Sequence, residues 1–235
     1  RRQRQMCIRD SLTSFKRDLY VAIPGYSSTR INAAYAYGGM DLLDETLTQN
    51  FGVEIDGNVE VDFEVFQVLV DKVGGIDLEL TQAEADYICG RDQSVLYPQP
   101  LRTDWDLQEG MNHLDGEQAL IHARNRSIGN SDYRRTERQQ EVLMAAFEKV
   151  KDLSAFSIAG LVKDVLPLVT TDLSFTEIIG YAMDVMSIGT GDIATYRIPE
   201  DGAYTPQTIS GMQVLVPDLE QNRKYLQQVL YHAEA

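Results

Sequence analysis

Short apolar segments separated by turn residues run along the whole chain, and their spacing predicts alternating strands and helices. Residues 12–23 alternate loosely and are rich in β-forming residues, so we expect a strand that is interrupted near Lys16-Arg17-Asp18. Residues 81–105 are less regular and are expected to run over the surface. We predict further strands at 58–62, 76–80, 193–198 and 212–216, and helices at 40–51, 63–73, 115–124, 132–153, 155–165, 175–187 and 219–232.

The segment 117–141 concentrates positive charge in a chain whose formal net charge is −15. On a helix that begins after Asp132, some of its arginines share one face with apolar residues, so they continue a stripe that faces the core. A buried guanidinium must be paired, and few carboxylates lie nearby on that face, so an external anion is a candidate partner. The arginines of the segment are Arg124, Arg126, Arg134, Arg135 and Arg138, and the apolar residues that continue the stripe of Arg135, Arg138 and Gln139 are Val142, Ala146 and Val150.

The start of the same helix also favours an anion. Asn130, Ser131 and Asp132 are all good N-cap residues, and arginines in the first turn oppose the helix dipole unless an anion lies there. Free N–H groups, the dipole and the arginines together predict a phosphate site. Arg124 lies on or beside the apolar stripe of the preceding helix, whereas Arg134 falls off the inward face. The alternative is a solvated charged face with local Glu–Arg pairs.

Composition narrows the possible chemistry. The 235 residues are enough for one α/β domain or two small ones, and one domain over residues 12–235 is the economical reading. The acidic balance argues against general nucleic-acid binding, which requires a broad basic surface. Two cysteines and three histidines make a zinc or histidine-rich centre improbable, so a metal here would be a hard, oxygen-ligated ion such as Mg²⁺. The chain contains no run of about 18 apolar residues that would predict a membrane-spanning helix.

The first residues do not resemble a folded segment. RRQRQMCIRD has neither a hydrophobic period nor the apolar core of a signal peptide, and we leave residues 1–11 out of the fold as a non-native sequence. We therefore expect the native protein to begin upstream of this chain.

The dipeptide Arg17-Asp18 places a cation beside a carboxylate at the break in the first strand. Such a carboxylate suits Mg²⁺ bound jointly with a diphosphate, because Mg²⁺ takes one or two protein carboxylates together with substrate phosphates. The alternative is a surface ion pair. The apolar residues of 63–70 could line a lipid pocket, although such a stripe is more often core. The sequence contains no phosphate-binding P-loop and no G-x-S-x-G elbow, which disfavours kinases and serine hydrolases.

Five blocks of the sequence resemble the LytR–CpsA–Psr family of cell-wall phosphotransferases. They are FKRDLYVAIPGY, STRINAAYAYGG, VEVDFEVFQVLVDKVGGIDLEL, LQEGMNHLDGEQALIHARNR and DYRRTERQQEVL. The blocks occur in family order and cover Leu12 to Leu153, and the later GMQVLVPDLEQNRKYL is similar to the usual ending of the family.

The resemblance implies a mixed central β-sheet flanked by helices on both faces, with a hydrophobic tunnel for a prenyl chain. It implies transfer of a glycopolymer, such as teichoic acid or capsule, from a polyprenyl-diphosphate-linked donor to peptidoglycan. The phosphotransferase would lie at the extracellular face of the membrane on an upstream anchor, with Mg²⁺ as cofactor and no nucleic-acid partner. The implied catalytic residues are Asp18, Arg30, Arg124, Arg126 and Arg135; the implied diphosphate-binding residues are Arg17, Asn32, Arg138 and Gln139; and Asp18 is the implied metal ligand.

The chain departs from the family pattern at two places. Lys16 stands where the family usually has proline before Arg-Asp, and the upstream strand with a second metal-linked aspartate is absent, a role that Asp10 does not take. Asp18 could either hold the metal or orient and deprotonate the acceptor hydroxyl. Two rival functions stay open, namely a non-catalytic envelope protein that binds polyprenyl phosphates and a regulatory or nucleic-acid-binding protein.

Overall fold

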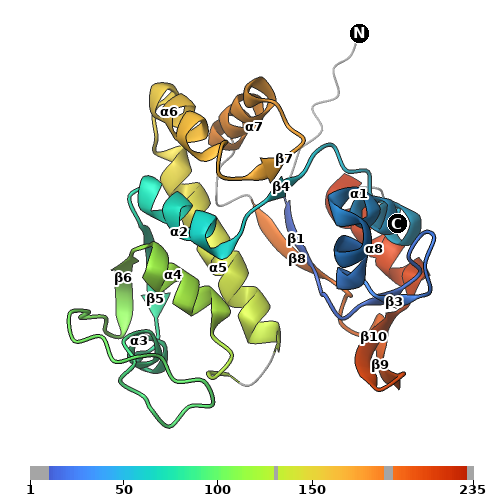
Figure 1. Cartoon of the computed structure of the whole chain (residues 1–235), viewed down its shortest axis with the longest axis horizontal. Helices are drawn as coiled ribbons and strands as arrows, with labels where there is room; N and C mark the ends of the chain where they lie inside the picture. Colours follow the sequence, from blue (N-terminus) through green and yellow to red (C-terminus); the bar gives the residue numbers. More distant parts are fainter. Residues whose placement is uncertain (1–10, 130–131, 188–192, 232–235) are drawn as a thin grey trace. The chain divides into compact units, whose positions relative to one another are not determined.

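The computed structural model describes residues 11–129, 132–187 and 193–231, and these fold into two compact units (Figure 1). The first unit contains the described residues up to position 58 and from 193 onward, and the second contains the described part of 59–190. Within the described residues the chain is a mixed α/β protein with eight helices and several small sheets.

The first unit is built around short strands at the break that the sequence predicts. Strand β1 (Ser11–Phe15) pairs in parallel with β8 (Ala194–Ile198), and β2 (Tyr20–Val21) follows in sequence. A backbone bridge between Leu19 and Leu215 joins β2 to the hairpin of β9 and β10. The remaining strands of this unit are β3 (Thr29–Arg30), which pairs with β2, and β9 (Tyr204–Ile209) and β10 (Met212–Pro217), which pair with each other.

Two helices complete the first unit, α1 (Asn32–Phe51) and α8 (Leu219–Tyr231). Helix α1 is interrupted at Gly38 and Gly39, where Gly39 adopts φ 67° and ψ −155°, a conformation that side chains other than glycine resist. The predicted helix at 40–51 is therefore the second half of a longer, kinked helix. Its C-terminal Phe51 packs with apolar residues of β2, β8 and α8, namely Leu19, Val21, Ile31, Ile198 and Leu226.

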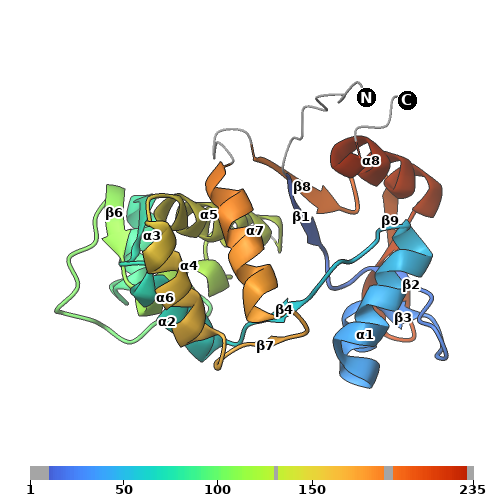
Figure 2. The same ribbon diagram turned by 90° about the horizontal axis from the view of Figure 1, so that it is seen from above.

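The second unit contains two short antiparallel ladders and six helices (Figure 2). Helices α6 and α7 lie side by side, and α4 packs against both α2 and α5. The ladders pair β4 (Val59–Glu60) with β7 (Thr170–Thr171) and β5 (Ile76–Leu80) with β6 (Gly110–Leu114). The helices are α2 (Phe63–Lys72), α3 (Gln82–Ile88), α4 (Gly116–Arg124), α5 (Asp132–Lys151), α6 (Ala155–Val165) and α7 (Phe175–Ser187).

Most predicted elements are confirmed, with five omissions. Helices α6 and α7 and strand β5 coincide with their predicted ranges, and α2 is followed by Gly74 and Gly75, which both have positive φ. Helix α3 and strands β3, β6, β7 and β9 were not expected. The family resemblance implied one mixed central sheet. In residues 11–129, 132–187 and 193–231 the strands instead pair as two-stranded ladders. None of the helices in these ranges is long and apolar enough to cross a membrane.

Candidate functional site

In the first unit, Asp18 lies between two arginines at the break that separates β1 from β2. Its Oδ2 is 3.5 Å from Nε of Arg17 and its Oδ1 is 3.3 Å from Nε of Arg30. The backbone carbonyl of Asp18 accepts a hydrogen bond of 2.9 Å from Leu215 N–H, which fixes the residue against β10. The structure therefore brings the carboxylate of Asp18 and the guanidinium of the adjacent Arg17 together with that of Arg30, which lies 12 positions after Asp18 in the sequence.

Arg30 is held from both sides. Its Nε and Nη2 both donate to the carbonyl oxygen of Gln213 in β10, at 3.2 and 2.6 Å. Asn32 begins helix α1, and its backbone N–H donates to the carbonyl of Arg17 at 3.5 Å. The predicted residues Arg17, Asp18, Arg30 and Asn32 are thus neighbours within one unit, with Arg17 and Asn32 exposed.

In the second unit, Arg124 and Arg126 are exposed at the end of α4. The helix begins with a capping box, in which the Asp115 side chain accepts from Gln118 N–H and the Gln118 side chain accepts from Asp115 N–H. The guanidinium of Arg124 lies over the ring of Phe63, 4.2 Å from its centroid. Arginines in this position keep most of their N–H donors directed to solvent, where an anion can reach them.

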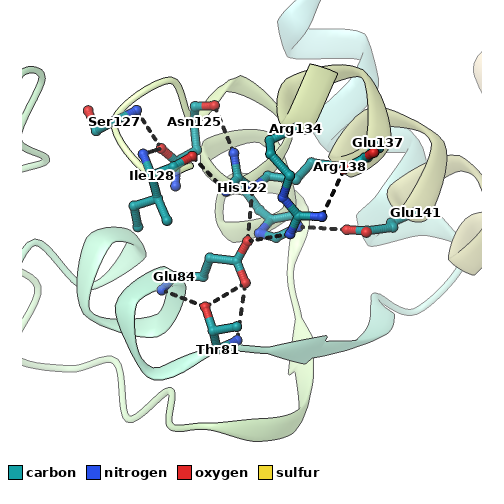
Figure 3. Close-up of polar contacts among 10 residues, drawn as sticks. All are labelled: Thr81, Glu84, His122, Asn125, Ser127, Ile128, Arg134, Glu137, Arg138 and Glu141. Atoms are coloured by element: carbon teal, nitrogen blue, oxygen red, sulfur yellow. Dashed lines mark hydrogen bonds and ion pairs between the residues drawn. The ribbon is translucent and has the colours of Figure 1, made fainter. Parts of the chain in front are cut away.

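Arg138 has a different environment, because its side chain is only 1% exposed. Its Nε donates to Oε1 of Glu84 at 2.9 Å, and its Nη1 and Nη2 donate to the carbonyl oxygens of Asn125 and Ile128 at 3.2 and 2.9 Å (Figure 3). The prediction that this guanidinium points inward is confirmed. The sequence offered an external anion as a candidate partner, whereas the structure pairs Arg138 with the carboxylate of Glu84, which lies 54 positions earlier in the chain, on α3.

Glu84 is itself fixed before it meets Arg138. Thr81 and Glu84 form a capping box at the start of α3, in which the Glu84 carboxylate accepts from the backbone N–H and the hydroxyl of Thr81 at 3.1 and 2.8 Å. Burial alone would raise the pKa of Glu84, but the hydrogen bonds from Arg138 and Thr81 outweigh burial and hold that pKa below its usual value. The pair is therefore ionised at neutral pH.

The other predicted residues of α5 divide between the inside and the outside. Val142 is buried, Arg135 is partly buried and Gln139 is exposed, so the predicted stripe is correct for Val142 but not for Gln139. Arg134 donates to Glu137 at 2.8 Å, which is one of the local pairs that the surface alternative predicted. The N-cap candidates Asn130 and Ser131 lie outside the described residues.

A metal ion would find one suitable ligand near the arginines of the first unit. The Asp18 side chain is 23% exposed, and its contacts with Arg17 and Arg30 are longer than direct hydrogen bonds. A hard carboxylate oxygen of this kind fits Mg²⁺ when diphosphate and water supply the other ligands. In the described part of the chain no group of three or more His, Cys, Asp or Glu residues could hold a metal by itself.

The sequence of the chain matches one known protein family over most of its length. The model of the LytR_cpsA_psr (LytR–CpsA–Psr) family matches residues 9–228 of the chain. The chain belongs to this family. The expectation raised by the five sequence blocks is confirmed, and the match extends through the C-terminal strands and helix α8.

The relatives of the chain include teichoic acid transferases and a regulatory protein. The chain is 29% identical to the polyisoprenyl-teichoic acid–peptidoglycan teichoic acid transferase TagT of Bacillus subtilis over 82% of its own length and 58% of TagT. It is 33% identical to TagU of Enterococcus faecalis over 75% of the chain and 54% of TagU. The regulatory protein MsrR of Staphylococcus aureus is 29% identical over 82% of the chain and 55% of MsrR. The chain thus spans little more than half the length of these relatives.

The fold of the chain is also similar to solved structures of this family. The crystal structure of B. subtilis TagV matches with a TM-score of 0.71 and 28% identity, covering 94% of this chain and 84% of TagV. A LytR-CPS2A-psr family protein, YwtF (TagT), with bound octaprenyl pyrophosphate lipid matches with a TM-score of 0.68 and 25% identity, covering 93% of this chain and 78% of that one.

Proposed function

We propose that this chain is the catalytic part of a phosphotransferase that attaches a glycopolymer to peptidoglycan. The observation that carries the proposal is the pair of exposed arginines Arg124 and Arg126 at the end of α4, in a family whose member TagT holds octaprenyl pyrophosphate. A second set of groups suited to a diphosphate, Arg17, Asp18 and Arg30, lies in the first unit. We propose that each set, within its own unit, is suited to the phosphate groups of a polyprenyl-diphosphate-linked donor.

The proposed reaction is a phosphoryl transfer. A sugar hydroxyl of peptidoglycan attacks the phosphorus that carries the glycan, the new P–O bond forms, and the bond to the bridging oxygen breaks so that polyprenyl phosphate leaves. The transition state spreads negative charge over the non-bridging oxygens, and fixed arginines stabilise that charge. In this proposal Arg30, Arg124, Arg126 and Arg135 supply that stabilisation, and Arg17, Asn32 and Gln139 contact the diphosphate. Arg138 is buried within the second unit, where its guanidinium donates to Glu84, Asn125 and Ile128.

Asp18 has two candidate roles in this reaction. It can provide one carboxylate ligand to Mg²⁺, which when bound neutralises charge on the diphosphate. It can also orient the acceptor hydroxyl and accept its proton, since its carboxylate is partly exposed beside Arg17 and Arg30. Both roles require the carboxylate, so Asp18→Asn removes either one.

We propose that exposed apolar residues of the second unit bind the prenyl chain, the role that the family resemblance gives to a hydrophobic tunnel. Large apolar side chains are exposed along α2, α5, α6 and α7 and in the segment between α6 and β7, and exposed apolar surface can mark a binding site. These residues are Phe63, Leu143, Phe156, Leu168, Phe175, Tyr181 and Met183. A prenyl chain on such a surface would leave its diphosphate beside Arg124, because Arg124 contacts Phe63.

The donor and the peptidoglycan acceptor together place this activity at the extracellular face of the bacterial cell membrane. An anchor upstream of the present chain would hold the enzyme there, as the family resemblance implies.

Glycan transfer from a synthetic polyprenyl-diphosphate-linked donor to peptidoglycan, measured with and without Mg²⁺, tests the proposal. We expect transfer by the wild-type chain and a loss of at least about a hundredfold in Arg124→Ala and Arg135→Ala, because removal of one group that stabilises transition-state charge typically costs that much. Circular dichroism and urea unfolding check that each variant is folded. Full transfer by both variants would overturn the assignment.

The second candidate function is binding without turnover, and the similarity to the regulatory protein MsrR favours it. A chain of this kind binds octaprenyl diphosphate with the same arginines but transfers no glycan at any Mg²⁺ concentration. The transfer assay therefore separates the two functions directly.

A further inference from the structure

We propose that Glu84 and Arg138 are positioning residues that hold the segment 124–128 in the conformation that presents Arg124 and Arg126 to a diphosphate. The inference rests on the proposed function, since it assigns the diphosphate to these two arginines. Glu84 belongs to none of the candidate sites predicted from the sequence.

The guanidinium of Arg138 ties together both ends of the short segment between α4 and α5. Nη1 donates to the carbonyl of Asn125, directly after the end of α4, and Nη2 donates to the carbonyl of Ile128. Nε donates to Glu84, so three different N–H groups of one planar side chain are engaged. The segment therefore cannot change shape without breaking hydrogen bonds to a buried charge, which is costly.

Asn125 closes the same segment from its own side. Its side-chain oxygen accepts from the backbone N–H groups of Ser127 and Ile128, at 2.9 and 3.2 Å, and the residue is fully buried. This local turn needs no distant partner. Figure 3 shows Asn125 held by these contacts of its carbonyl and its side chain. The flanking Arg124 and Arg126 are both exposed.

Glu84 supplies the charge that makes this arrangement possible. An arginine buried without a counter-ion would be strongly destabilising, and its positive charge would attract the very diphosphate that Arg124 and Arg126 are placed to bind. The carboxylate of Glu84 neutralises Arg138 and is itself held by Thr81. Arg138 can therefore act through hydrogen-bond geometry while the exposed arginines provide the net positive charge.

The geometry requires arginine and not merely a positive charge. A lysine ammonium at position 138 would keep the charge and could reach Glu84, but it has no planar fork with which to join the carbonyls of Asn125 and Ile128. Arg138→Lys therefore removes the hydrogen bonds that position the segment while it keeps the positive charge. Glu84→Gln removes the negative charge of the carboxylate while it keeps a hydrogen-bond acceptor for Arg138.

Arg91 provides a matched control in the same unit. Its Nη1 and Nη2 donate to the carbonyl oxygens of Leu107 and Trp105 at 2.8 and 3.3 Å, and Nη1 also meets Asp86 at 3.2 Å. Arg91→Lys thus breaks the same kind of fork in a segment that carries none of the candidate arginines. It tests whether any change of this type weakens binding.

The test compares affinity for octaprenyl diphosphate with affinity for uncharged octaprenol in the wild type, Arg138→Lys, Glu84→Gln and Arg91→Lys. We expect Arg138→Lys and Glu84→Gln to lower diphosphate affinity about tenfold and leave octaprenol affinity unchanged, while Arg91→Lys changes neither. A role that is only structural would lower both affinities together. That result, or unchanged diphosphate affinity in a folded Arg138→Lys protein, would overturn the proposal.

The same measurements distinguish failure of the positioning role from failure of the transferase. A wild-type chain that binds octaprenyl diphosphate but transfers no glycan contradicts the transferase, and the expected pattern of affinities would still support the positioning pair. A wild-type chain without affinity for octaprenyl diphosphate would overturn both.

Discussion

The guanidinium of Arg124 lies 4.2 Å from the centre of the Phe63 ring, although the two residues are on different helices, α4 and α2. Phe63 is the first residue of α2, and Asp62 caps that helix by accepting from Val65 N–H. More than half of the Phe63 side chain is exposed. The ring therefore supports a cation that would otherwise be free to take many rotamers, and it does so at the edge of the apolar surface of the second unit.

Loss of the Phe63 ring is expected to weaken binding of the donor. An exposed cation–π contact contributes about 0.5–1 kcal/mol, which corresponds to a roughly two- to fivefold change in affinity. We expect Phe63→Leu to reduce affinity for octaprenyl diphosphate by that factor, measured by titration. Phe63→Tyr keeps an aromatic face beneath Arg124 and should bind as the wild type does. Equal affinity of the leucine and tyrosine variants would show that the ring plays no part in holding Arg124.

The start of α4 is set by close packing against α2. A Cβ atom at Gly116 would lie 2.3 Å from the carbonyl oxygen of Gln67, and the Gly116 N–H donates to the Asp71 carboxylate at 2.7 Å. Gly116→Ala should therefore destabilise the protein by about 1–3 kcal/mol through overpacking, as measured by urea unfolding.

Gly160 is the matched control for this substitution. It lies inside α6, where a Cβ atom would meet nothing within 4 Å. Gly160→Ala should stabilise the protein by about 0.4–1 kcal/mol, because alanine loses less conformational freedom on folding. The prediction fails if both substitutions change stability in the same direction.

In the first unit, Arg30 and Arg223 both donate to backbone carbonyl oxygens, but only Arg30 belongs to the candidate site. Arg30 donates through two nitrogens to Gln213 and lies beside Asp18, whereas Arg223 donates to the carbonyls of Asn50 and Gln49 at 2.6 and 2.9 Å. Lysine at either position loses the fork of hydrogen bonds but keeps the charge. We expect Arg30→Lys to reduce glycan transfer about tenfold or more and Arg223→Lys to leave it unchanged. A similar loss in both variants would assign the effect to stability and not to the candidate site.

Local patterns were sufficient for most elements of the fold. Helical spacing, capping boxes and glycine stops depend on residues within one turn of each other, which is why α2, α4, α6 and α7 could be predicted. Helix α3 carries the same kind of signal, since Thr81 and Glu84 have capping-box spacing, but the irregular residues that follow hid it. The shape of the sheet depends on pairing between distant strands, such as β1 with β8, and no local pattern contains that information.

The candidate site shows the same limit. That Arg138 points inward follows from its place on the apolar stripe of α5, but its partner Glu84 could not be found, because hydrogen bonds between distant segments depend on the folded packing of α3 against the rest of the unit. The neighbours Arg17, Asp18 and Arg30 were grouped by family resemblance. Their ion pairs and the bond from Arg30 to Gln213 are known only from the structure.

The last prediction concerns how the Glu84–Arg138 pair responds to pH. The folded-state pKa of Glu84 lies below its ordinary value of 4.5, so folding favours the ionised carboxylate. The stabilisation is therefore fully present above about pH 4.5 and is lost as pH falls through the lower pKa of the folded state. The titratable groups that face Glu84 are Arg138, Arg134 at 4.0 Å, His122 and Glu141, and the two arginines stay positive throughout this range.

Glu84→Gln should consequently be destabilising in a pH-dependent manner. At pH 7 the substitution leaves Arg138 buried without its counter-ion, which typically costs about 3–5 kcal/mol. Below pH 4.5 the wild-type carboxyl becomes neutral as well, and the difference between the two proteins in free energy of unfolding should narrow. Glu177→Gln is the control, because Glu177 caps α7 through Ser174 from an exposed position. Urea unfolding of the three proteins between pH 3 and 7 measures the effect, and a difference for Glu84→Gln that is constant over this range would show that the charge of Glu84 does not stabilise Arg138.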